Sequence, residues 1–245
     1  MKQMIPVADP DALLKYARGL TARNGNGFLI SGGCDRNGRI PLGPYMDVIA
    51  QVKRESALLI NAHTGLLDRK SAESLVRASP DRLSVDVVQD RRVIRGLMHL
   101  RVGPDAYRET LVNLFDSGAE GVVPHICVGL SKTNEGERAA LSLVREFDIS
   151  ALVVLVLMPP NGSPQYKPPP VDDARVVDFI KEATDNLRCP VLLGCMRPRG
   201  NWALEVDCID AGISGIATPS RRTVAIAKES GLELEVREKC CAFYR

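Results

Sequence analysis

The sequence lacks both long hydrophobic runs and an excess of charge of either sign. Its longest apolar run covers the eight residues 151–158, which is too short to span a bilayer. The N-terminal stretch MKQMIPVADPD has neither the apolar core nor the small-residue cleavage site of a signal peptide. Lys and Arg number 32 against 30 Asp and Glu, so no basic surplus exists for nucleic acid or anionic lipid. These absences predict a cytoplasmic protein with no nucleic-acid and no membrane partner.

Closely spaced cysteine pairs of the zinc-ribbon kind are also lacking. The seven cysteines include no CxxC pair, and their spacings do not match those of a zinc site. In a cytoplasmic protein they are expected to be thiols and not a disulfide framework. The cysteines are at positions 34, 127, 189, 195, 208, 240 and 241.

What the sequence does contain is a series of short runs rich in Val, Ile and Leu. Most are continuously apolar, which is typical of strands buried on both faces of a parallel sheet. Amphipathic segments lie between several of them. The runs alternate in units of about 20–40 residues, which predicts one (β/α) TIM-type barrel over residues 1–245. The alternative is a doubly wound open sheet, although no GxGxxG turn is found. The expected strands are 28–31, 57–61, 83–88, 121–125, 151–157, 191–195, 213–218 and 232–236, and the expected helices are 11–23, 44–54, 105–116, 172–187 and 221–229.

The order of these elements is unusual for a barrel. The series begins with a helix, whereas a (β/α)8 barrel begins with a strand. Either residues 232–236 form the eighth strand, or the first strand is missing and the barrel is partial. Three helix-to-strand junctions, at 24–28, 117–122 and 211–216, each contain two glycines. The first glycine suits a left-handed position after a helix, and the second suits close backbone packing at the start of a strand.

Candidate acid–base residues collect where strands end. Functional side chains of (β/α) barrels come from the carboxyl ends of the strands. His63 and His125 fall at such ends, and histidine can transfer protons or bind metal near neutral pH. Asp86 lies in an otherwise apolar strand, where a carboxylate requires a partner or a ligand. We therefore take these three as candidate catalytic residues; the alternative is that the two histidines only orient loops.

Other strand ends carry weaker signals. Gly32 and Gly33 follow a strand and allow backbone N–H groups to approach a ligand. Cys195, in the set Cys195-Met196-Arg197, could ligate a soft metal or simply fill the core. Ser220 can cap a final helix, and the basic residues at 221 and 222 could hold an anion there.

A proline-rich segment follows the fifth expected strand. Residues 158–173 contain six of the 16 prolines, which makes the segment stiff and extended. It is long for a connection and lies at the expected active-site face, so it is either a lid, a partner surface or a rigid connection.

Several of these segments resemble radical S-adenosylmethionine proteins of the biotin-synthase-like group, most closely the two-component lipoyl synthase type. The most specific stretches are ISGGCD at 30–35 and PHICVGL at 124–130, with further matches at 4–7, 27–29, 38–42, 61–65, 84–88 and 194–198. The resemblance covers nearly the whole chain. It implies a 5′-deoxyadenosyl radical that abstracts hydrogen from an unactivated carbon, as in sulfur insertion into a lipoyl- or biotin-type substrate.

The resemblance also implies cofactors and their residues. The cofactors would be S-adenosylmethionine and a [4Fe–4S] cluster. The glycine motif would bind the amino group, and the backbone around residue 126 would pack on the adenine. The implied S-adenosylmethionine site comprises Ser31, Gly32, Gly33, Asp86, Ile126 and Gly129. The candidate thiol ligands of an auxiliary cluster are Cys195, Cys208, Cys240 and Cys241.

One departure from the family pattern outweighs the matches. The family holds its cluster with CxxxCxxC after the first barrel strand, and this chain has no such motif. The missing motif and the missing first strand coincide, so we expect a barrel that lacks this opening piece and is inactive in radical chemistry, because cluster iron needs thiolate ligands. Two alternatives stay open: a cluster-free lyase or isomerase using His63, His125 and Asp86 on a small molecule, or a non-catalytic partner subunit or homodimer.

Overall fold

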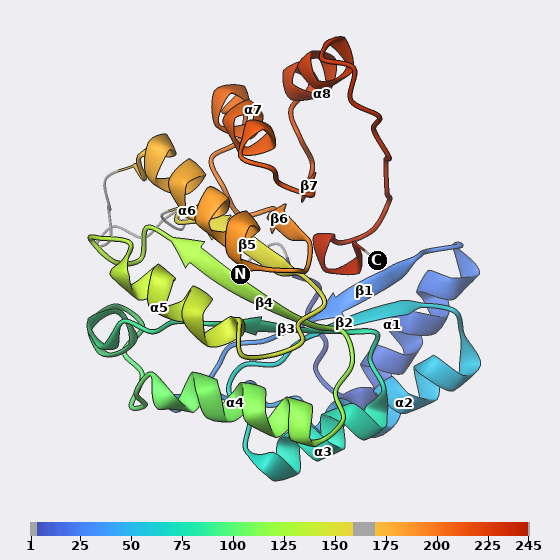
Figure 1. The fold of residues 1–245 in the computed structure, drawn as a ribbon. Coiled ribbons are helices and arrows are strands. Elements are labelled where there is room, and N and C mark those ends of the chain that lie inside the picture. The colour runs from blue at the N-terminus through green and yellow to red at the C-terminus, as the bar shows by residue number, and fades with distance from the viewer. Residues whose placement is uncertain (1–3, 159–169, 245) are drawn as a thin grey trace.

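Seven parallel strands form a single curled sheet in the computed structural model, which describes residues 4–158 and 170–244. The strands are hydrogen-bonded in sequence order, each to the next, as in a barrel wall that has been opened (Figure 1). The expected partial (β/α) barrel is confirmed. Its strands are β1 (Gly27–Ile30), β2 (Leu59–His63), β3 (Arg82–Asp86), β4 (Val122–Val128), β5 (Leu152–Val156), β6 (Val191–Leu193) and β7 (Gly215–Ile216).

Helices cover the convex side of this sheet (Figure 1). Local caps set several of their starts: Asp9, Asp172 and Ser220 each accept a hydrogen bond from a backbone N–H of the first turn. The expected cap at Ser220 is confirmed. The helices are α1 (Pro10–Ala22), α2 (Met46–Glu55), α3 (Arg69–Ala78), α4 (Asp105–Asp116), α5 (Glu135–Val144), α6 (Asp173–Asn186), α7 (Trp202–Asp210) and α8 (Arg221–Glu229), with short turns η1 (Gly43–Tyr45), η2 (Val93–Leu97) and η3 (Cys241–Phe243). No helix of the described residues is long and apolar enough to cross a membrane.

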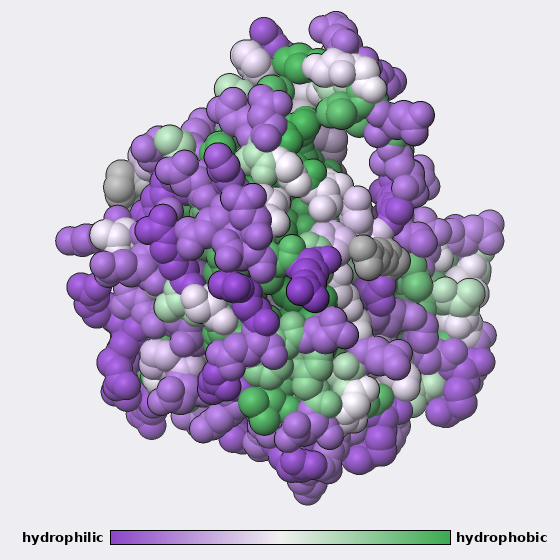
Figure 2. Space-filling view, in the orientation of Figure 1, coloured by the Kyte–Doolittle hydropathy of each residue, from purple (hydrophilic) through white to green (hydrophobic). Residues whose placement is uncertain are grey.

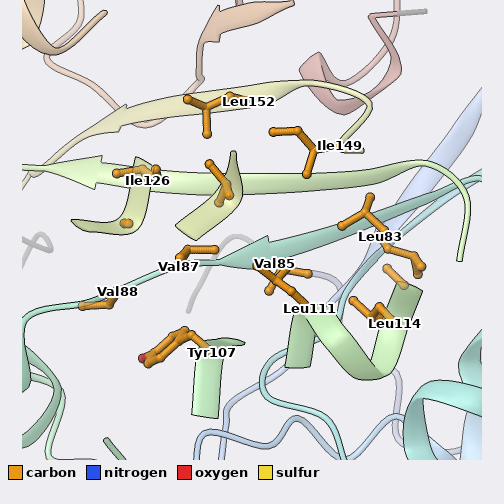
Figure 3. Close-up of a cluster of buried hydrophobic side chains, with 14 of the residues drawn as sticks. Leu83, Val85, Val87, Val88, Tyr107, Leu111, Leu114, Ile126, Ile149 and Leu152 are labelled. Carbon is orange, nitrogen blue, oxygen red and sulfur yellow. The ribbon is translucent and has the colours of Figure 1, made fainter. Parts of the chain in front are cut away.

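The two faces of the sheet bury different sets of side chains. Every second residue points toward the helices, and these residues form the large apolar core, in which Val85 and Ile126 pack with Leu111 of α4 (Figure 3). The alternate residues face the concave side. There a smaller apolar cluster includes Val123, Val153 and Leu192. Polar side chains can therefore reach a ligand only from the second set.

The expected eighth strand at 232–236 is wrong. Its alternating Leu-Glu-Leu-Glu-Val pattern looks like a strand, but Leu232 and Leu234 are 45% and 42% exposed and Val236 is 88% exposed. Open space separates this segment from the rest of the molecule (Figure 2). The alternating pattern does not produce a strand here because no neighbouring strand forms backbone hydrogen bonds with this segment. The strands β1 and β7 therefore both remain edges of the sheet.

The C-terminal segment instead enters the concave side of the sheet. Arg82 on β3 donates from Nε to the carbonyl of Ala242 at 3.0 Å, and Asn26 donates to the carbonyl of Glu238 at 3.2 Å. Ala242 is 1% exposed and packs in the concave apolar cluster. The segment thus closes the floor of the open barrel near the amino ends of the strands.

The glycine junctions are correct with one exception. At the second and third junctions Gly118 and Gly212 take the left-handed conformation, with φ of +80° and +86°. At the first, Asn24 takes it, with φ +55°, because asparagine tolerates this region better than other side chains. Close packing is also as expected: a Cβ on Gly27 would lie 2.1 Å from the Leu59 carbonyl oxygen.

Candidate functional site

Three titratable side chains meet on the concave face. His63 and Asp86 end β2 and β3, whereas His125, expected at a strand end, lies in the middle of β4, which continues to Val128. The sheet register places His63 of β2 beside Ser84 of β3, and Asp86 of β3 beside His125 of β4. The His63 Nε2 atom lies 3.1 Å from Asp86 Oδ2. The two histidine rings are stacked, with centroids 5.9 Å apart and planes 29° apart. The structure therefore brings together the three residues that were predicted from the sequence to be candidates for acid–base chemistry.

Asp86 has the partner that its position required. Its side chain is 51% exposed and that of His63 is 26% exposed, so the pair faces open space on the concave side. Confinement among protein atoms raises the pKa of the Asp86 carboxyl, but the hydrogen bond from His63 and the charges of both histidines lower the pKa more, so that it ends below its usual value. Asp86 is accordingly an anion at neutral pH.

The two histidines are shifted in opposite directions. Burial lowers the pKa of His63, but the hydrogen bond and charge of Asp86 raise it more, and the net pKa lies above 6.5. Burial lowers the pKa of His125 to about 4, helped by the nearby His63 charge and opposed by Asp86. The His125 Nδ1 atom lies 3.0 Å from the Val123 carbonyl oxygen. Since only an N–H can pair with a carbonyl, neutral His125 carries its proton on Nδ1 and keeps Nε2 as an acceptor.

Polar and thiol side chains that were not on the sequence-based list extend this face. Asn61 lies two residues before His63 and accepts a hydrogen bond from the Ser84 hydroxyl at 2.9 Å. Cys127 lies two residues after His125, and burial raises the pKa of its thiol to about 12, with Asp86 and Glu137 contributing. Cys127 is therefore a neutral thiol at pH 7 and not a nucleophile. The period-two alternation of the strands was the signal that could have identified both residues.

The glycine-rich segment after β1 is open to a ligand. Ser31 follows β1, which ends at Ile30, and a Cβ added to Gly33 would meet no atom within 4 Å. A Cβ on Gly32 would approach only the Ile40 side chain, at 3.3 Å. The segment therefore leaves room for a bound group, as the S-adenosylmethionine prediction requires, and that assignment stays a prediction.

The two other proposed cofactor residues face elsewhere. The Ile126 side chain is 1% exposed and packs in the convex core (Figure 3), so only its backbone is available to a ligand. Gly129 has φ +101°, and a Cβ there would lie 2.3 Å from Val171 Cγ2. Its N–H donates to the buried Glu137 carboxylate at 3.0 Å. Gly129 is thus explained by loop packing.

Replacing Gly129 with alanine should therefore destabilise the protein. We expect the free energy of unfolding to fall by roughly 2 kcal/mol, because a positive φ is strained for alanine and Val171 must move. Gly118 provides the control: it also has positive φ, but a Cβ there would meet nothing within 4 Å, so Gly118→Ala should cost about 1 kcal/mol or less. Equal losses in urea unfolding of the two variants would show that Val171 packing plays no part.

Arg197, in the set singled out around Cys195, points into the interior of the protein. Its side chain is 1% exposed and its guanidinium pairs with the Glu205 carboxylate, donating also to the carbonyls of Gly194 and Ala217. The N–H of Ser220 donates to the same carboxylate at 2.8 Å. The ion pair ties β6 and β7 to α7 and α8, so these residues have a structural role.

The candidate auxiliary ligands divide into two groups. Cys208 lies on α7 within the convex core, where burial raises the pKa of its thiol to about 12. Cys195 and Cys240 are exposed, and Cys241 is partly buried in the C-terminal segment. Within residues 4–158 and 170–244, no three or more His, Cys, Asp or Glu side chains are arranged to hold a metal ion. The proline-rich segment that could act as a lid or a partner surface falls largely at 159–169, outside the described residues.

The residues present do not fit a [4Fe–4S] cluster. Such a cluster requires a set of thiolate ligands in one place, and the part of the chain that the structure describes offers no ligand group of that kind. The S-adenosylmethionine site fits in part, since residues 31–33 are open while Gly129 is filled by Val171. We therefore derive no reaction step through the cluster.

Comparisons with known proteins identify the fold. A scan against protein-family models finds no match, and neither does a search of the curated proteins. Among solved structures, the crystal structure of HydG, a maturase of the [FeFe]-hydrogenase, matches with a TM-score of 0.65 and 15% identity over 91% of this chain and 52% of that chain. HydG from Carboxydothermus hydrogenoformans matches with a TM-score of 0.61 and 15% identity, covering 88% of this chain and 52% of that chain. Methylornithine synthase, PylB, also gives 0.61, with 14% identity over 92% of this chain and 73% of its own.

These matches establish the architecture only. The chain spans about half the length of the HydG structures, and identities of 14–15% do not carry function between proteins. No match singles out the biotin-synthase-like or lipoyl synthase group. The chain has a partial (β/α) barrel fold that is similar to the folds of the hydrogenase maturase HydG and of methylornithine synthase PylB.

Proposed function

We propose that the concave face is a cluster-free acid–base site for a small polar molecule. The observation that carries the proposal is the contact of Asp86 with His63 at 3.1 Å, with His125 stacked on the same histidine. Two identical side chains whose surroundings push their pKa values apart are the arrangement expected of an acid and a base. A lyase or isomerase reaction that moves one proton uses such a pair.

The roles follow from protonation. His63 is held toward its charged form by Asp86, so it is the proton donor, and Asp86 orients it through Nε2. His125 is neutral down to about pH 4 and has Nε2 free to accept a proton, so it is the base. A substrate carbonyl lying on His63 would be polarised while His125 removes a proton from the adjacent carbon. Cys127, on the same face of β4 as His125, would contact the same substrate.

Replacing Asp86 with asparagine should test the electrostatic half of this proposal. Without the carboxylate, burial alone acts on His63, so we expect its pKa to fall from above 6.5 to below 6.5. Titration of the imidazole proton signals by NMR measures this directly, because the chain has only three histidines. His99 is exposed and lies on the loop before α4, so its signal is the internal control. An unchanged His63 pKa would remove Asp86 as its partner.

Catalysis can be tested in aerobic, chelator-treated buffer. Small keto and hydroxy acids incubated in D2O should exchange a carbon-bound proton when the acid–base pair engages them. Replacing His125 with asparagine should slow that exchange by about 10²- to 10⁴-fold, the usual contribution of a general base. His99→Asn is the matched control and should leave the rate unchanged. Retention of full activity in both His63→Asn and His125→Asn would contradict the proposal.

A second candidate function is binding of S-adenosylmethionine. Two observations favour it: the fold similarity to HydG and PylB, and the open space at Gly33. Radical chemistry on a lipoyl- or biotin-type substrate would require cluster ligands that the described residues do not offer. Isothermal titration with S-adenosylmethionine decides the matter: saturable binding that is lost in Gly33→Val supports this candidate, and no heat from a folded sample removes it.

A further inference from the structure

An open cavity of about 450 Å³ lies at the amino ends of β1 and β2. His63 and Asp86 end their strands at the opposite edge of the same parallel sheet. The cavity is lined by the turn between α1 and β1, by the loop before β2 and by Lys239 of the C-terminal segment. Cavities of roughly 300–1,000 Å³ are the size that small molecules occupy. This end of the barrel therefore has room for a ligand, and the proposed acid–base site uses none of the lining residues.

The turn and the loop give the cavity two kinds of surface. The turn contributes the side-chain amides of Asn24 and Asn26, and Asn26 is fixed because its amide donates to the carbonyl of Glu238 at 3.2 Å. The loop before β2 contributes the apolar side chains of Ala57 and Leu59. A few placed polar groups beside apolar surface are typical of sites for small organic molecules.

Lys239 supplies the positive charge of the cavity. Its ammonium group forms no salt bridge with any residue that the structure describes. The hydrogen bonds from Arg237, aided by the charges of Arg237 and Lys239, lower the pKa of the nearby Glu235 carboxyl. That carboxylate is already held by two hydrogen bonds from Arg237, at 2.8 and 2.7 Å. Lys239 is therefore available to an anionic group of a ligand.

Two backbone N–H groups of the lining residues are also available. Among the described residues, the N–H groups of Asn26 and Ala57 have no hydrogen-bond acceptor. The carbonyls of Leu20 and Thr21 at the end of α1, which would repel an anion, already accept hydrogen bonds from the N–H groups of residues 23–25. Free N–H donors beside an ammonium group favour a carboxylate, because hydrogen bonds to an ionised acceptor are the strong ones.

We propose that this cavity binds a small organic acid, with its carboxylate at Lys239 and its apolar body against Ala57 and Leu59. The bound acid joins the C-terminal segment, which carries Lys239, to the turn that carries Asn26. A ligand that binds only the folded chain stabilises it, so the acid is expected to raise the melting temperature. The site is independent of the proposed acid–base function, because the two share no residue and lie at opposite ends of the sheet.

The test uses the full-length chain and three probes that separate charge from shape. Phenylacetate has a carboxylate and an apolar body, phenylacetamide has nearly the same shape without the charge, and inorganic phosphate has charge without an apolar body. We expect phenylacetate to bind with roughly millimolar affinity, as its size of about ten non-hydrogen atoms allows. Its binding should shift the backbone amide NMR signals of Asn26 and Ala57 and leave the imidazole signals of His63 in place. The other two probes should bind at least about tenfold more weakly, because each lacks one of the two interactions.

Variants of the lining residues identify the cavity as the site. Lys239→Met keeps an apolar side chain of similar length without the charge and should weaken phenylacetate binding by about tenfold or more. Ala57→Trp should fill the cavity and abolish binding. Lys228→Met, at an exposed position on α8, is the matched control and should bind as the wild type does. Circular dichroism establishes that each variant is folded.

Four results would overturn the proposal. They are the absence of saturable phenylacetate binding to the wild type, equal binding of phenylacetate and phenylacetamide, unchanged affinity in Lys239→Met, and signal shifts confined to the face around His63. The last result would place the acid at the concave site, so a failure of this proposal is distinguishable from a failure of the acid–base function.

Discussion

Replacing Glu205 with glutamine is expected to lower the free energy of unfolding by about 3–5 kcal/mol, the usual cost of breaking a buried ion pair by removing one partner. The carboxylate is 2% exposed and accepts hydrogen bonds from the Arg197 guanidinium, the Ser220 N–H and the Thr223 hydroxyl. Glutamine can replace some of these contacts but leaves Arg197 charged and buried. Urea unfolding at pH 7, followed by circular dichroism, measures the loss.

An exposed ion pair of the same type is the matched control. Arg138 and Glu182 form a pair whose side chains are 54% and 33% exposed, so Glu182→Gln should cost less than about 1 kcal/mol. The double variant Arg197→Met/Glu205→Leu should recover much of the lost stability, because no charge is then left buried. A loss in Glu205→Gln no greater than that in Glu182→Gln would contradict the structural role of the pair.

This pair could not have been predicted from the sequence, because its energy depends on burial. Arg197 follows a strand and, by sequence alone, is indistinguishable from a substrate-binding arginine. Only the packing of α7 against β6 shows that Glu205 faces it.

The strands were predictable for a physical reason. Strands of a parallel sheet covered by helices must be apolar on most positions, and all seven observed strands overlap predicted ones. The helices α3, α5 and α7 were not among the predicted ones. The α3 sequence RKSAESLVRA buries Ala72, Leu75 and Ala78, whose three-residue spacing marks one face of a helix and was the signal that could have identified it. Residues 232–236 are the opposite case, because they were predicted as a strand and form none. Alternating apolar residues do not by themselves ensure that a neighbouring strand is there to pair with.

The candidate acid–base site was partly predictable. Strand ends placed His63 and Asp86 in one region, because parallel strands bring their carboxyl ends together. His125 lies in the middle of β4 and joins them because the sheet register pairs it with Asp86. The sequence could not say that one histidine would be charged and the other neutral. That difference arises from burial, which lowers the pKa of His125, and from the hydrogen bond of Asp86 to His63, which raises the pKa of His63.

The buried neutral state of His125 should also be visible in the stability of the protein. Its pKa lies at about 4 in the folded chain and near 6.5 when unfolded, so the unfolded chain binds the proton first as the pH falls. The stability that His125 contributes is therefore full above pH 6.5 and is lost toward pH 4. We expect the wild type to lose about 3 kcal/mol more than His125→Asn between pH 7 and pH 4.

Asparagine suits this test because its side-chain amide can donate to the Val123 carbonyl as the Nδ1–H does, yet it does not titrate. The contribution of His63 has the opposite sign: its raised pKa adds stability below pH 6.5 that is lost as the pH rises through the folded pKa. Because both proteins contain His63, this contribution cancels in the comparison. Urea unfolding at half-unit pH steps gives the difference, with His99→Asn as the control. If wild type and His125→Asn lose the same stability as the pH falls, His125 is not held neutral. That result would contradict its role as the base of the proposed pair.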